Sequence, residues 1–329
     1  MISLRVDMVN PEMLTLLRDS GCLSIGFGLE SADNTILKSM KKHITVEQMD
    51  YALNLCNELG INCNGNFIFG DQNETVETAM NTINWWRSHP QYRIAMHLIV
   101  LYPGSELYNV GIAKGAIKDP VQFIKDGCPY TNISKMTDQE YRDIALLTSV
   151  LQQGRTDHLK DTSISYMGFG KVSLSGRCPK CGKMNTWEHQ DLFRSLGTII
   201  CEHCYHSMNV IASDYAGDIV ESNFRKLSKH KIGVWPMTNA VSEFIEKCPS
   251  ALSDNTFLID SSAMKQGGKY KGKIVYSPTI INDEKIDTVF LSVTTSVATE
   301  IISELKTKYT TVKNIFFLGD LIKDDFHID

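Results

Sequence analysis

Two Cys-x-x-Cys pairs form the most specific chemical signal in the sequence, and 19 residues separate the pairs. Thiolates at this spacing are typical of a tetrahedral structural zinc site, in which two short turns supply two ligands each. We therefore predict a zinc ribbon over residues 171–212, after a linker at residues 161–170, with Met184–Trp187 and Leu196–Ile200 as hairpin strands that bring the pairs together. An iron–sulfur cluster on the same thiolates is the alternative. The four predicted ligands are Cys178, Cys181, Cys201 and Cys204.

A second group of candidate residues follows the predicted strands in the first half of the chain. These are Glu30 and Ser31, Gly70 to Glu74, and Tyr102 to Gly104. They are informative because parallel α/β sheets bind ligands at the carboxyl ends of their strands. A carboxylate such as that of Glu30 accepts charge-assisted hydrogen bonds from hydroxyl or ammonium groups. Its alternative role is to stabilise the start of the following helix.

Alternating strand and helix patterns position this second group. Asn10 precedes Pro11 as a helix N-cap, and Thr45 with Gln48 fits a capping box. Strand–helix–strand repeats of this length require a parallel sheet. The expected strands cover residues 3–8, 23–28, 63–69 and 94–101, and the helices begin near residues 11, 33, 45 and 74.

Five strings in this region occur in an order that resembles the later strands of the radical S-adenosylmethionine (SAM) core. The resemblance is to the branch that often carries an N-terminal cobalamin-binding domain. It implies an α/β fold in which residues 1–160 form the C-terminal part of a partial (β/α)6 barrel with a trailing helix. The strings are Arg5 to Asp7, Gly26 to Ser31, Lys41 to Thr45, Phe67 to Thr75 and Tyr102 to Tyr108.

The resemblance implies a SAM site at the strand ends. Glu30 and its neighbour would contact the ribose or the amino-acid part of SAM, and Gly70 would let the backbone approach the adenine side. Glu74 is expected to hold this loop in shape rather than to touch the ligand. No catalytic residue is assigned. The seven implied cofactor-binding residues are Glu30, Ser31, Ile68, Gly70, Glu74, Leu101 and Tyr102.

One motif of the family is missing from the sequence. The family holds a 4Fe–4S cluster with Cys-x3-Cys-x2-Cys, whereas Cys22, Cys56 and Cys63 are too far apart to form that triplet. We therefore expect the cluster ligands to lie outside this chain, which would be a fragment lacking the first half of the barrel. The complete enzyme would cleave SAM reductively to drive radical chemistry on a small molecule, with methyl transfer favoured if cobalamin is bound. The rival interpretation is a complete protein with a degenerate barrel.

Residues 228–329 show a second strand–helix alternation, which predicts a small parallel sheet and loosely resembles a Rossmann-like domain. The first strand, 232–236, is not followed by Gly-x-Gly-x-x-Gly, which argues against a dinucleotide site. Asp260 ends the second strand, where a ribose-binding acid could stand. The basic segment Lys265–Lys273 is interpreted as a solvated hairpin loop.

The composition excludes some classes of function. A net charge of −5 gives no electrostatic footprint for nucleic acid or an anionic membrane surface. Single cysteines scattered beside a metal-type cluster indicate a reducing compartment, so we expect a cytoplasmic protein that acts on a small molecule. The alternative function is a non-catalytic one, in which the ribbon and the last domain bind a partner protein.

Overall fold

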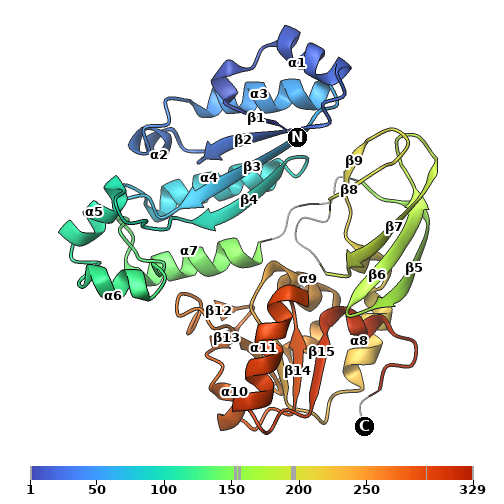
Figure 1. Cartoon of the computed structure of the whole chain (residues 1–329). Coiled ribbons are helices and arrows are strands. Elements are labelled where there is room, and N and C mark those ends of the chain that lie inside the picture. The colour runs from blue at the N-terminus through green and yellow to red at the C-terminus, as the bar shows by residue number, and fades with distance from the viewer. Residues whose placement is uncertain (1, 152–153, 155–156, 194–197, 294, 328–329) are drawn as a thin grey trace. The chain divides into compact units, whose positions relative to one another are not determined.

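The fold is presented from a computed structural model (Figure 1), which describes residues 2–151, 154, 157–193, 198–293 and 295–327. The chain divides into two compact units, Met1–Thr148 and Ser149–Asp329, which we call unit 1 and unit 2.

Unit 1 contains a four-stranded parallel sheet in the order β1-β2-β3-β4. Helices connect consecutive strands, as the alternation predicted. The strands are β1 (Ile2–Leu4), β2 (Ser24–Glu30), β3 (Asn62–Phe69) and β4 (Arg93–Leu98). The connecting helices are α1 (Pro11–Asp19), α2 (Asn34–Ser39), α3 (Val46–Glu58) and α4 (Val76–Ser88), and α5 (Glu106–Ala113), α6 (Pro120–Lys125) and α7 (Asp138–Val150) follow the sheet.

The helix starts of unit 1 follow the predicted capping chemistry. The Asn10 side chain accepts a hydrogen bond from the Met13 N–H at 2.9 Å, and Thr45 forms the capping box with Gln48 that precedes α3. Each cap satisfies backbone N–H groups that a helix start otherwise leaves unpaired. Local sequence therefore fixes where these helices begin.

Two strand predictions in unit 1 were too long. Residues 6–8 form a 3-10 turn instead of continuing β1, because the Met8 N–H bonds back to the Arg5 carbonyl. The last ladder pair of β4 ends at Leu98, three residues before the predicted end.

Unit 2 begins with an antiparallel sheet in the order β5-β6-β7. The segment expected to be a linker, 161–170, lies mostly within β5, so that prediction was wrong. The reason is its period-2 pattern, in which Ile164 and Tyr166 alternate with polar residues along the pleat. The bounds are β5 (Lys160–Gly168), β6 (Lys171–Arg177), β7 (Met184–Asp191), β8 (Thr198–Ile200) and β9 (Ser207–Asn209).

The predicted pairing of the ribbon strands was also wrong. Met184–Trp187 lies in β7, which pairs with β6, and the described part of Leu196–Ile200 lies in β8, which pairs with β9. Residues 196 and 197 lie outside the described residues. Each Cys-x-x-Cys pair therefore sits at the turn of its own hairpin.

A six-stranded sheet completes unit 2, in the order β12-β13-β11-β10-β14-β15. The five strands from β13 to β15 are parallel and follow the 3-2-1-4-5 order of doubly wound sheets. The strands are β10 (Ile232–Trp235), β11 (Thr256–Ile259), β12 (Lys269–Tyr270), β13 (Lys273–Tyr276), β14 (Thr288–Leu291) and β15 (Asn314–Phe317). The helices are α8 (Gly217–Arg225), α9 (Asn239–Lys247), α10 (Ile280–Asp283) and α11 (Thr295–Lys308).

Two side chains in this sheet differ from their predicted roles. Asp260 accepts hydrogen bonds from the backbone N–H groups of Met237 and Ser262, and it also pairs with Lys265. The Asp260 carboxylate therefore connects the loop after β10, which carries Met237, to the loop after β11, which carries Ser262 and Lys265. Lys265 is correspondingly half-buried, and only the β12–β13 turn matches the predicted solvated loop.

The two sheets of unit 2 meet at the buried carboxylate of Asp320, which follows β15. It accepts hydrogen bonds from the Tyr166 hydroxyl at 2.5 Å and from the Gly170 N–H at 3.2 Å. Gly319 has no room for a Cβ, because that atom would lie 1.9 Å from the Gly170 carbonyl oxygen. These contacts connect the β5-β6-β7 sheet to the last sheet within unit 2.

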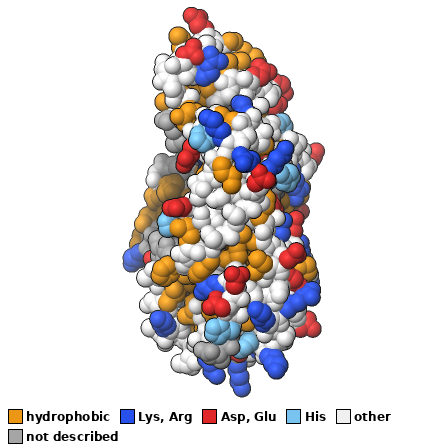
Figure 2. Space-filling model, turned by 90° about the vertical axis from the view of Figure 1, so that its right-hand side faces the viewer, with side chains coloured by type: hydrophobic (Ala, Val, Ile, Leu, Met, Phe, Trp, Pro, Cys, Tyr) orange, Lys and Arg blue, Asp and Glu red, His pale blue; other side chains and the backbone are white. Residues whose placement is uncertain are grey.

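The surface of unit 2 is of mixed character. Figure 2 shows hydrophobic side chains among charged ones on the face that carries β5 and the C-terminal residues, and the exposed hydrophobic residues of unit 2 include Phe169 and Ile219. Across the described residues, no helix is long and apolar enough to cross a membrane.

Candidate ligand cavity and metal centre

A cavity of about 380 Å³ opens at the carboxyl ends of β2 and β3 in unit 1. Its volume falls within the range of roughly 300–1,000 Å³ that small-molecule sites occupy. The lining residues come from the ends of β2, β3 and β4, the end of α2 with the α2–α3 loop, and the start of α5: Glu30, Ser39, Met40, Lys41, Lys42, Ile68, Asp71, Gln72, Ile99, Glu106 and Leu107.

A β-bulge directs Glu30 toward this cavity. The β2–β3 register shifts between Gly28 and Glu30, and Glu30 adopts a left-handed φ of 64°. Bulges re-aim side chains, and left-handed backbone at a non-glycine residue costs on the order of 1–2 kcal/mol. This local strain therefore fixes a carboxylate at the cavity.

The Glu30 carboxylate is paired with Lys42 from the α2–α3 loop. The Lys42 Nζ–Glu30 Oε1 distance is 2.8 Å, and both side chains are only about a fifth to a quarter exposed. Gly28 makes room for the pair: a Cβ at this position would lie 2.8 Å from Lys42 Nζ.

The remaining lining combines an apolar floor with satisfied polar groups. Ile68 and Ile99 contribute to the floor. Asp71 is buried, and its Oδ1 accepts hydrogen bonds from the Ser39 hydroxyl at 2.6 Å and the Asn73 N–H at 2.9 Å. The Asp71 carboxylate is thus occupied in shaping the loop.

Glu74 stabilises the same loop, which follows β3, through a contact with its backbone. Its buried Oε2 accepts a hydrogen bond from the Gly70 N–H, and Gly70 adopts a φ of 106° that favours glycine. Loss of solvation on burial raises the pKa of Glu74 to about 8, although the Gly70 N–H opposes the shift. Thr75, not Glu74, caps α4. The placement matches a loop-holding residue.

The structure places the other predicted residues away from the cavity lining. The buried Ser31 hydroxyl is hydrogen-bonded to Thr82 Oγ1 at 2.9 Å, Leu101 lies in a hydrophobic cluster, and Tyr102 is exposed. The cavity lining thus includes Glu30 and Ile68 of the seven predicted residues. Their cofactor roles stay predictions.

Sequence reasoning did not assign Lys42 or Ser39 to this cavity, and it included Asp71 only within the candidate range Gly70 to Glu74. Lys42, Ser39 and Asp71 line it through one ion pair and one hydrogen-bond network. Lys42 lies in a string quoted for the family resemblance, and Asp71 directly follows the positive-φ Gly70. The strand-end rule thus included Asp71 in its range, whereas nothing in the pattern indicates that the α2–α3 loop folds over β2.

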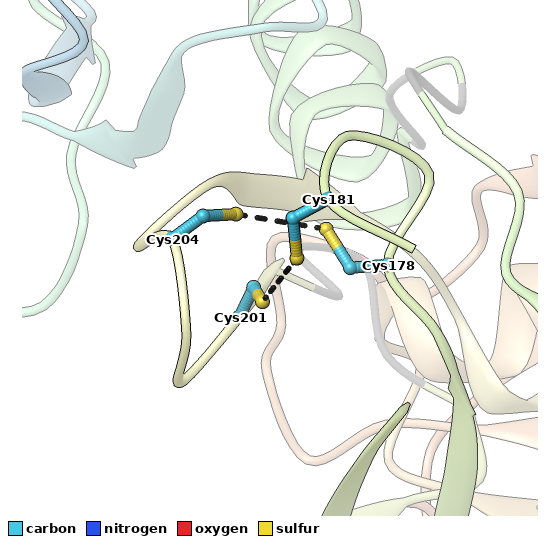
Figure 3. Close-up of side chains that lie close together, drawn as sticks. All are labelled: Cys178, Cys181, Cys201 and Cys204. Atoms are coloured by element: carbon cyan, nitrogen blue, oxygen red, sulfur yellow. Dashed lines mark hydrogen bonds between the residues drawn. The ribbon is translucent and has the colours of Figure 1, made fainter. Parts of the chain in front are cut away.

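The four predicted metal-ligating cysteines converge in unit 2 (Figure 3). All four Sγ atoms lie within 4.8 Å of one another, with separations of 3.8 Å for Cys178–Cys204 and 3.6 Å for Cys181–Cys201. Zn–S bonds of about 2.3 Å at tetrahedral angles would set neighbouring sulfurs about 3.8 Å apart. The thiols therefore fit one tetrahedral metal ion, and a multi-iron cluster would need them farther apart.

The two hairpin turns have matching backbone geometry. The Gly182 N–H bonds to the Cys178 carbonyl, and the Tyr205 N–H bonds to the Cys201 carbonyl, each at 2.9 Å. Gly182 and Tyr205 both have positive φ values, of 71° and 57°. This repeated turn presents the two thiols of each pair on one side.

Residues 1–85 match the family described as the radical SAM superfamily. The similarity to this superfamily is confined to the N-terminal segment of the chain. The match covers β1 to β3, and so includes two of the strand ends that line the cavity, those of β2 and β3.

Two curated methyltransferases are similar to part of the chain. The uncharacterized methyltransferase PH0819 of Pyrococcus horikoshii is 29% identical over 172 residues, which are 47% of this chain and 36% of that protein. Bacteriochlorophyllide d C-8(2)-methyltransferase of Chlorobaculum tepidum is 26% identical over 102 residues, which are 30% of this chain and 23% of that protein. The chain thus spans about a third or less of these relatives.

Similarity to solved structures is low. The radical SAM methyltransferase TsrM from Kitasatospora setae, solved with cobalamin and a [4Fe–4S] cluster, is 21% identical; the match covers 35% of this chain and 21% of TsrM at a TM-score of 0.31. The archaeal Elp3 of Methanocaldococcus infernus is 12% identical over 69% of this chain and 68% of its own, at a TM-score of 0.34.

The radical SAM segment does not itself fit a 4Fe–4S cluster. Cys56 and Cys63 are buried in α3 and β3, and Cys22 is not grouped with them. Within the described part of the chain, the ribbon cysteines form the one group of three or more metal-ligating residues. The described residues of unit 1 therefore do not include a group of cysteines that could ligate the cluster.

Proposed function

We propose that the cavity at the β2 and β3 ends binds SAM, and that this chain forms the SAM-binding part of a radical SAM enzyme. The observation that carries the proposal is the coincidence of the radical SAM match with a cavity lined by Glu30 and Ile68. The apolar floor suits an adenine ring, and the charged rim suits the polar end of SAM.

In this proposal, each side chain has a limited role. Ile68 gives the adenine an apolar contact, and Glu30 accepts hydrogen bonds from the polar end of SAM. Asp71 and Glu74 hold the loop after β3 in shape. A 4Fe–4S cluster, bound by cysteines outside this chain, would supply the electron that cleaves SAM to methionine and a 5′-deoxyadenosyl radical.

The overall reaction proposed is radical chemistry on a small molecule. Similarity to two methyltransferases and to a cobalamin-containing radical SAM methyltransferase favours cobalamin-dependent methyl transfer. The sheet of unit 1 would then be the later part of a (β/α)6 barrel, and the last sheet of unit 2 a Rossmann-like domain.

For the ribbon we propose a structural zinc ion. The sulfur separations suit one tetrahedral ion, and four thiolates complete its coordination, as in closed structural sites. Zinc would stabilise a segment whose strands β8 and β9 have three residues each.

The direct test is calorimetric titration of the full chain with SAM. Wild type should bind SAM, and Glu30→Gln should weaken binding about tenfold, the usual effect of losing a charge-assisted hydrogen bond. Glu74→Gln is the matched control, because it makes the same carboxyl-to-amide exchange outside the cavity lining and keeps an acceptor for the Gly70 N–H. No SAM binding by wild type, or equal affinities for wild type and Glu30→Gln, would contradict the proposal.

A further inference from the structure

We propose that the free edge of β5 and the groove beside it form a docking site for an extended, basic segment of a partner protein. The segment would add a further strand to the β5-β6-β7 sheet and place apolar side chains in the groove. The site lies within unit 2 and does not depend on SAM binding by unit 1, so it goes beyond the proposed function.

β5 has a strand partner on one side only. It pairs with β6, and among the residues that the structure describes no other segment forms a hydrogen bond with its backbone. Figure 1 shows β5 at the outer edge of its sheet. In an antiparallel pair, every second residue turns its N–H and C=O away from the partner strand, so this edge presents unpaired backbone groups.

The sequence of β5 leaves this edge open to another strand. Natural sheets protect their edges with charged residues, prolines or bulges. β5 carries its two charges, Lys160 and Asp161, at its start, and residues 162–168 contain neither a charge nor a proline. The register shifts of β5 lie before Ser163 and after Tyr166, so the run between them is regular and can pair with a further strand.

A groove of about 430 Å³ lies beside this regular run. It is lined by Ile164, Ser165 and Tyr166 of β5, by Ile219 of α8 and by residues 322–325. Ile219 is 39% exposed and Ile164 is half-buried, so apolar surface faces the groove. A strand paired with β5 would direct alternate side chains toward this surface. In such complexes the backbone hydrogen bonds give affinity, and pockets for alternate side chains give specificity.

The charges at the groove favour a basic partner. Asp324 and Asp325 are exposed in the lining, and within the described part of the chain neither carboxylate takes part in an ion pair. Lys323 is already engaged, because its Nζ lies 3.6 Å from Asp320 Oδ1 and 4.8 Å from the centre of the Tyr166 ring. Lysine or arginine side chains of the partner would therefore meet two negative charges that no cation of the groove compensates.

A second copy of this chain suits the edge less well. An antiparallel pair of two β5 strands would bring the Asp324 and Asp325 carboxylates of both copies to one joint edge. Like charges placed together at an interface oppose association, whereas a basic segment neutralises them. The charge at the groove thus favours a segment of another protein over self-pairing.

The experiment measures peptide binding to the full chain by fluorescence anisotropy. The probe is a labelled seven-residue peptide of alternating valine and lysine, and a second probe carries glutamate in place of lysine. The valine–lysine peptide should bind about fivefold more tightly or better. Two N-methylated versions of it, methylated at the valines or at the lysines, each lose the N–H groups along one strand edge. One version should bind about tenfold more weakly than the other, since only one edge pairs with β5.

Variants of the chain locate the binding site. Ile219→Lys removes an apolar contact and adds a repelling charge, so it should weaken binding of the valine–lysine peptide about tenfold or more. Val297→Lys is the matched control, because Val297 is an exposed apolar residue of α11 outside the groove lining. Asp324→Lys combined with Asp325→Lys should reverse the preference in favour of the valine–glutamate peptide. Thermal melting checks that the variants fold.

Amide hydrogen exchange identifies the strand that pairs. The valine–lysine peptide should slow exchange in residues 160–168, because their outward N–H groups gain acceptors. The proposal fails if this peptide does not bind or is not preferred, if the two N-methylated versions bind equally, or if Ile219→Lys and Val297→Lys have the same effect. Sedimentation of wild type as a dimer that Ile219→Lys dissociates would also overturn it, because the occupant would then be a second copy.

Discussion

The four-cysteine site and the cavity of unit 1 are assembled from very different distances along the chain. Each Cys-x-x-Cys pair is held by one hairpin turn, so two local turns supply the whole site. The cavity joins three strand ends, the α2–α3 loop and the start of α5. A local site can be predicted from residue spacing, whereas a site built by sheet topology depends on register and loop packing. Removal of one side chain should therefore have different effects on the four-cysteine site and on the cavity.

The largest effect is expected for Cys201→Ala. Loss of one thiolate should release the zinc and unfold the ribbon locally, because structural zinc supplies on the order of 10 kcal/mol in small zinc domains. Metal analysis should give about one zinc per chain in wild type, and limited proteolysis should map new cleavage to residues 171–212 of the variant.

Cys128→Ser is the control for Cys201→Ala, because Cys128 is a half-buried free cysteine outside the metal group. Stoichiometric zinc in Cys201→Ala, or wild type purified reduced and anaerobically without metal, would contradict the zinc site. Iron in place of zinc would change the identity of the metal but preserve the four-cysteine site.

A single change in the cavity loop should alter the pH dependence of stability instead of unfolding a segment. Burial raises the pKa of Glu74 from 4.5 to about 8. Between these values the native state holds a proton that the unfolded chain releases, so stability falls as pH rises through this window. The loss is on the order of a few kcal/mol, since each pKa unit corresponds to about 1.4 kcal/mol.

The measurement for Glu74 is urea unfolding of wild type and Glu74→Gln at pH 5 and pH 8. Because the amide does not titrate, Glu74→Gln should not lose this stability between pH 5 and pH 8. The free energy of unfolding of Glu74→Gln relative to that of wild type should therefore be higher at pH 8 than at pH 5. Glu77→Gln, on the exposed first turn of α4, is the control. Parallel pH profiles for wild type and Glu74→Gln would show that Glu74 titrates normally.

Loss of the contact between the two sheets of unit 2 should have an effect on stability of intermediate size. Asp320→Ala should destabilise unit 2 by about 3 kcal/mol, because it leaves the Tyr166 hydroxyl and the Gly170 and Phe317 N–H groups without their acceptor. Asp324→Ala, at a nearby exposed carboxylate, should change stability by less than about 0.5 kcal/mol. Equal melting temperatures for the two variants would refute this role of Asp320.

The sequence predicted the helix starts of unit 1 and the metal-ligating cysteines, which depend on local rules. Asn10, Thr45 and the cysteine pairs act through neighbours a few residues away, and their predicted interactions are present. Pairing between strands was harder to predict. The polar alternation of β5 was interpreted as a linker. The partners of β7 and β8 were misassigned because β7 is mostly polar and β8 has three residues, and such strands specify their pairing weakly.

The Glu30–Lys42 pair illustrates the limit most clearly. The position of Glu30 at a strand end was predicted, but its orientation depends on a register shift of one residue between Gly28 and Glu30. A one-residue slip changes the face to which a side chain points. No periodicity in the sequence marks that shift, so Lys42 could not be named as the partner.

The smallest effect is expected at Tyr141, which packs over the cavity loop. Its ring is buried, and its hydroxyl has no hydrogen-bond partner among the described residues. A buried hydroxyl without a partner loses its hydration and gains no hydrogen bond in return. Tyr141→Phe keeps the ring against Gly70 and removes that cost, so we expect unchanged stability or a gain of up to about 1 kcal/mol.

The matched comparison is Tyr92→Phe, which should lose about 1 kcal/mol because the Tyr92 hydroxyl donates to Asn54 Oδ1 at 2.9 Å. Thermal unfolding of both variants at pH 7 measures the difference. A loss at Tyr141 as large as that at Tyr92 would mean that the hydroxyl has a partner, such as a bound water shared with Glu74, and the loop would then depend on a polar contact like that at Asp320.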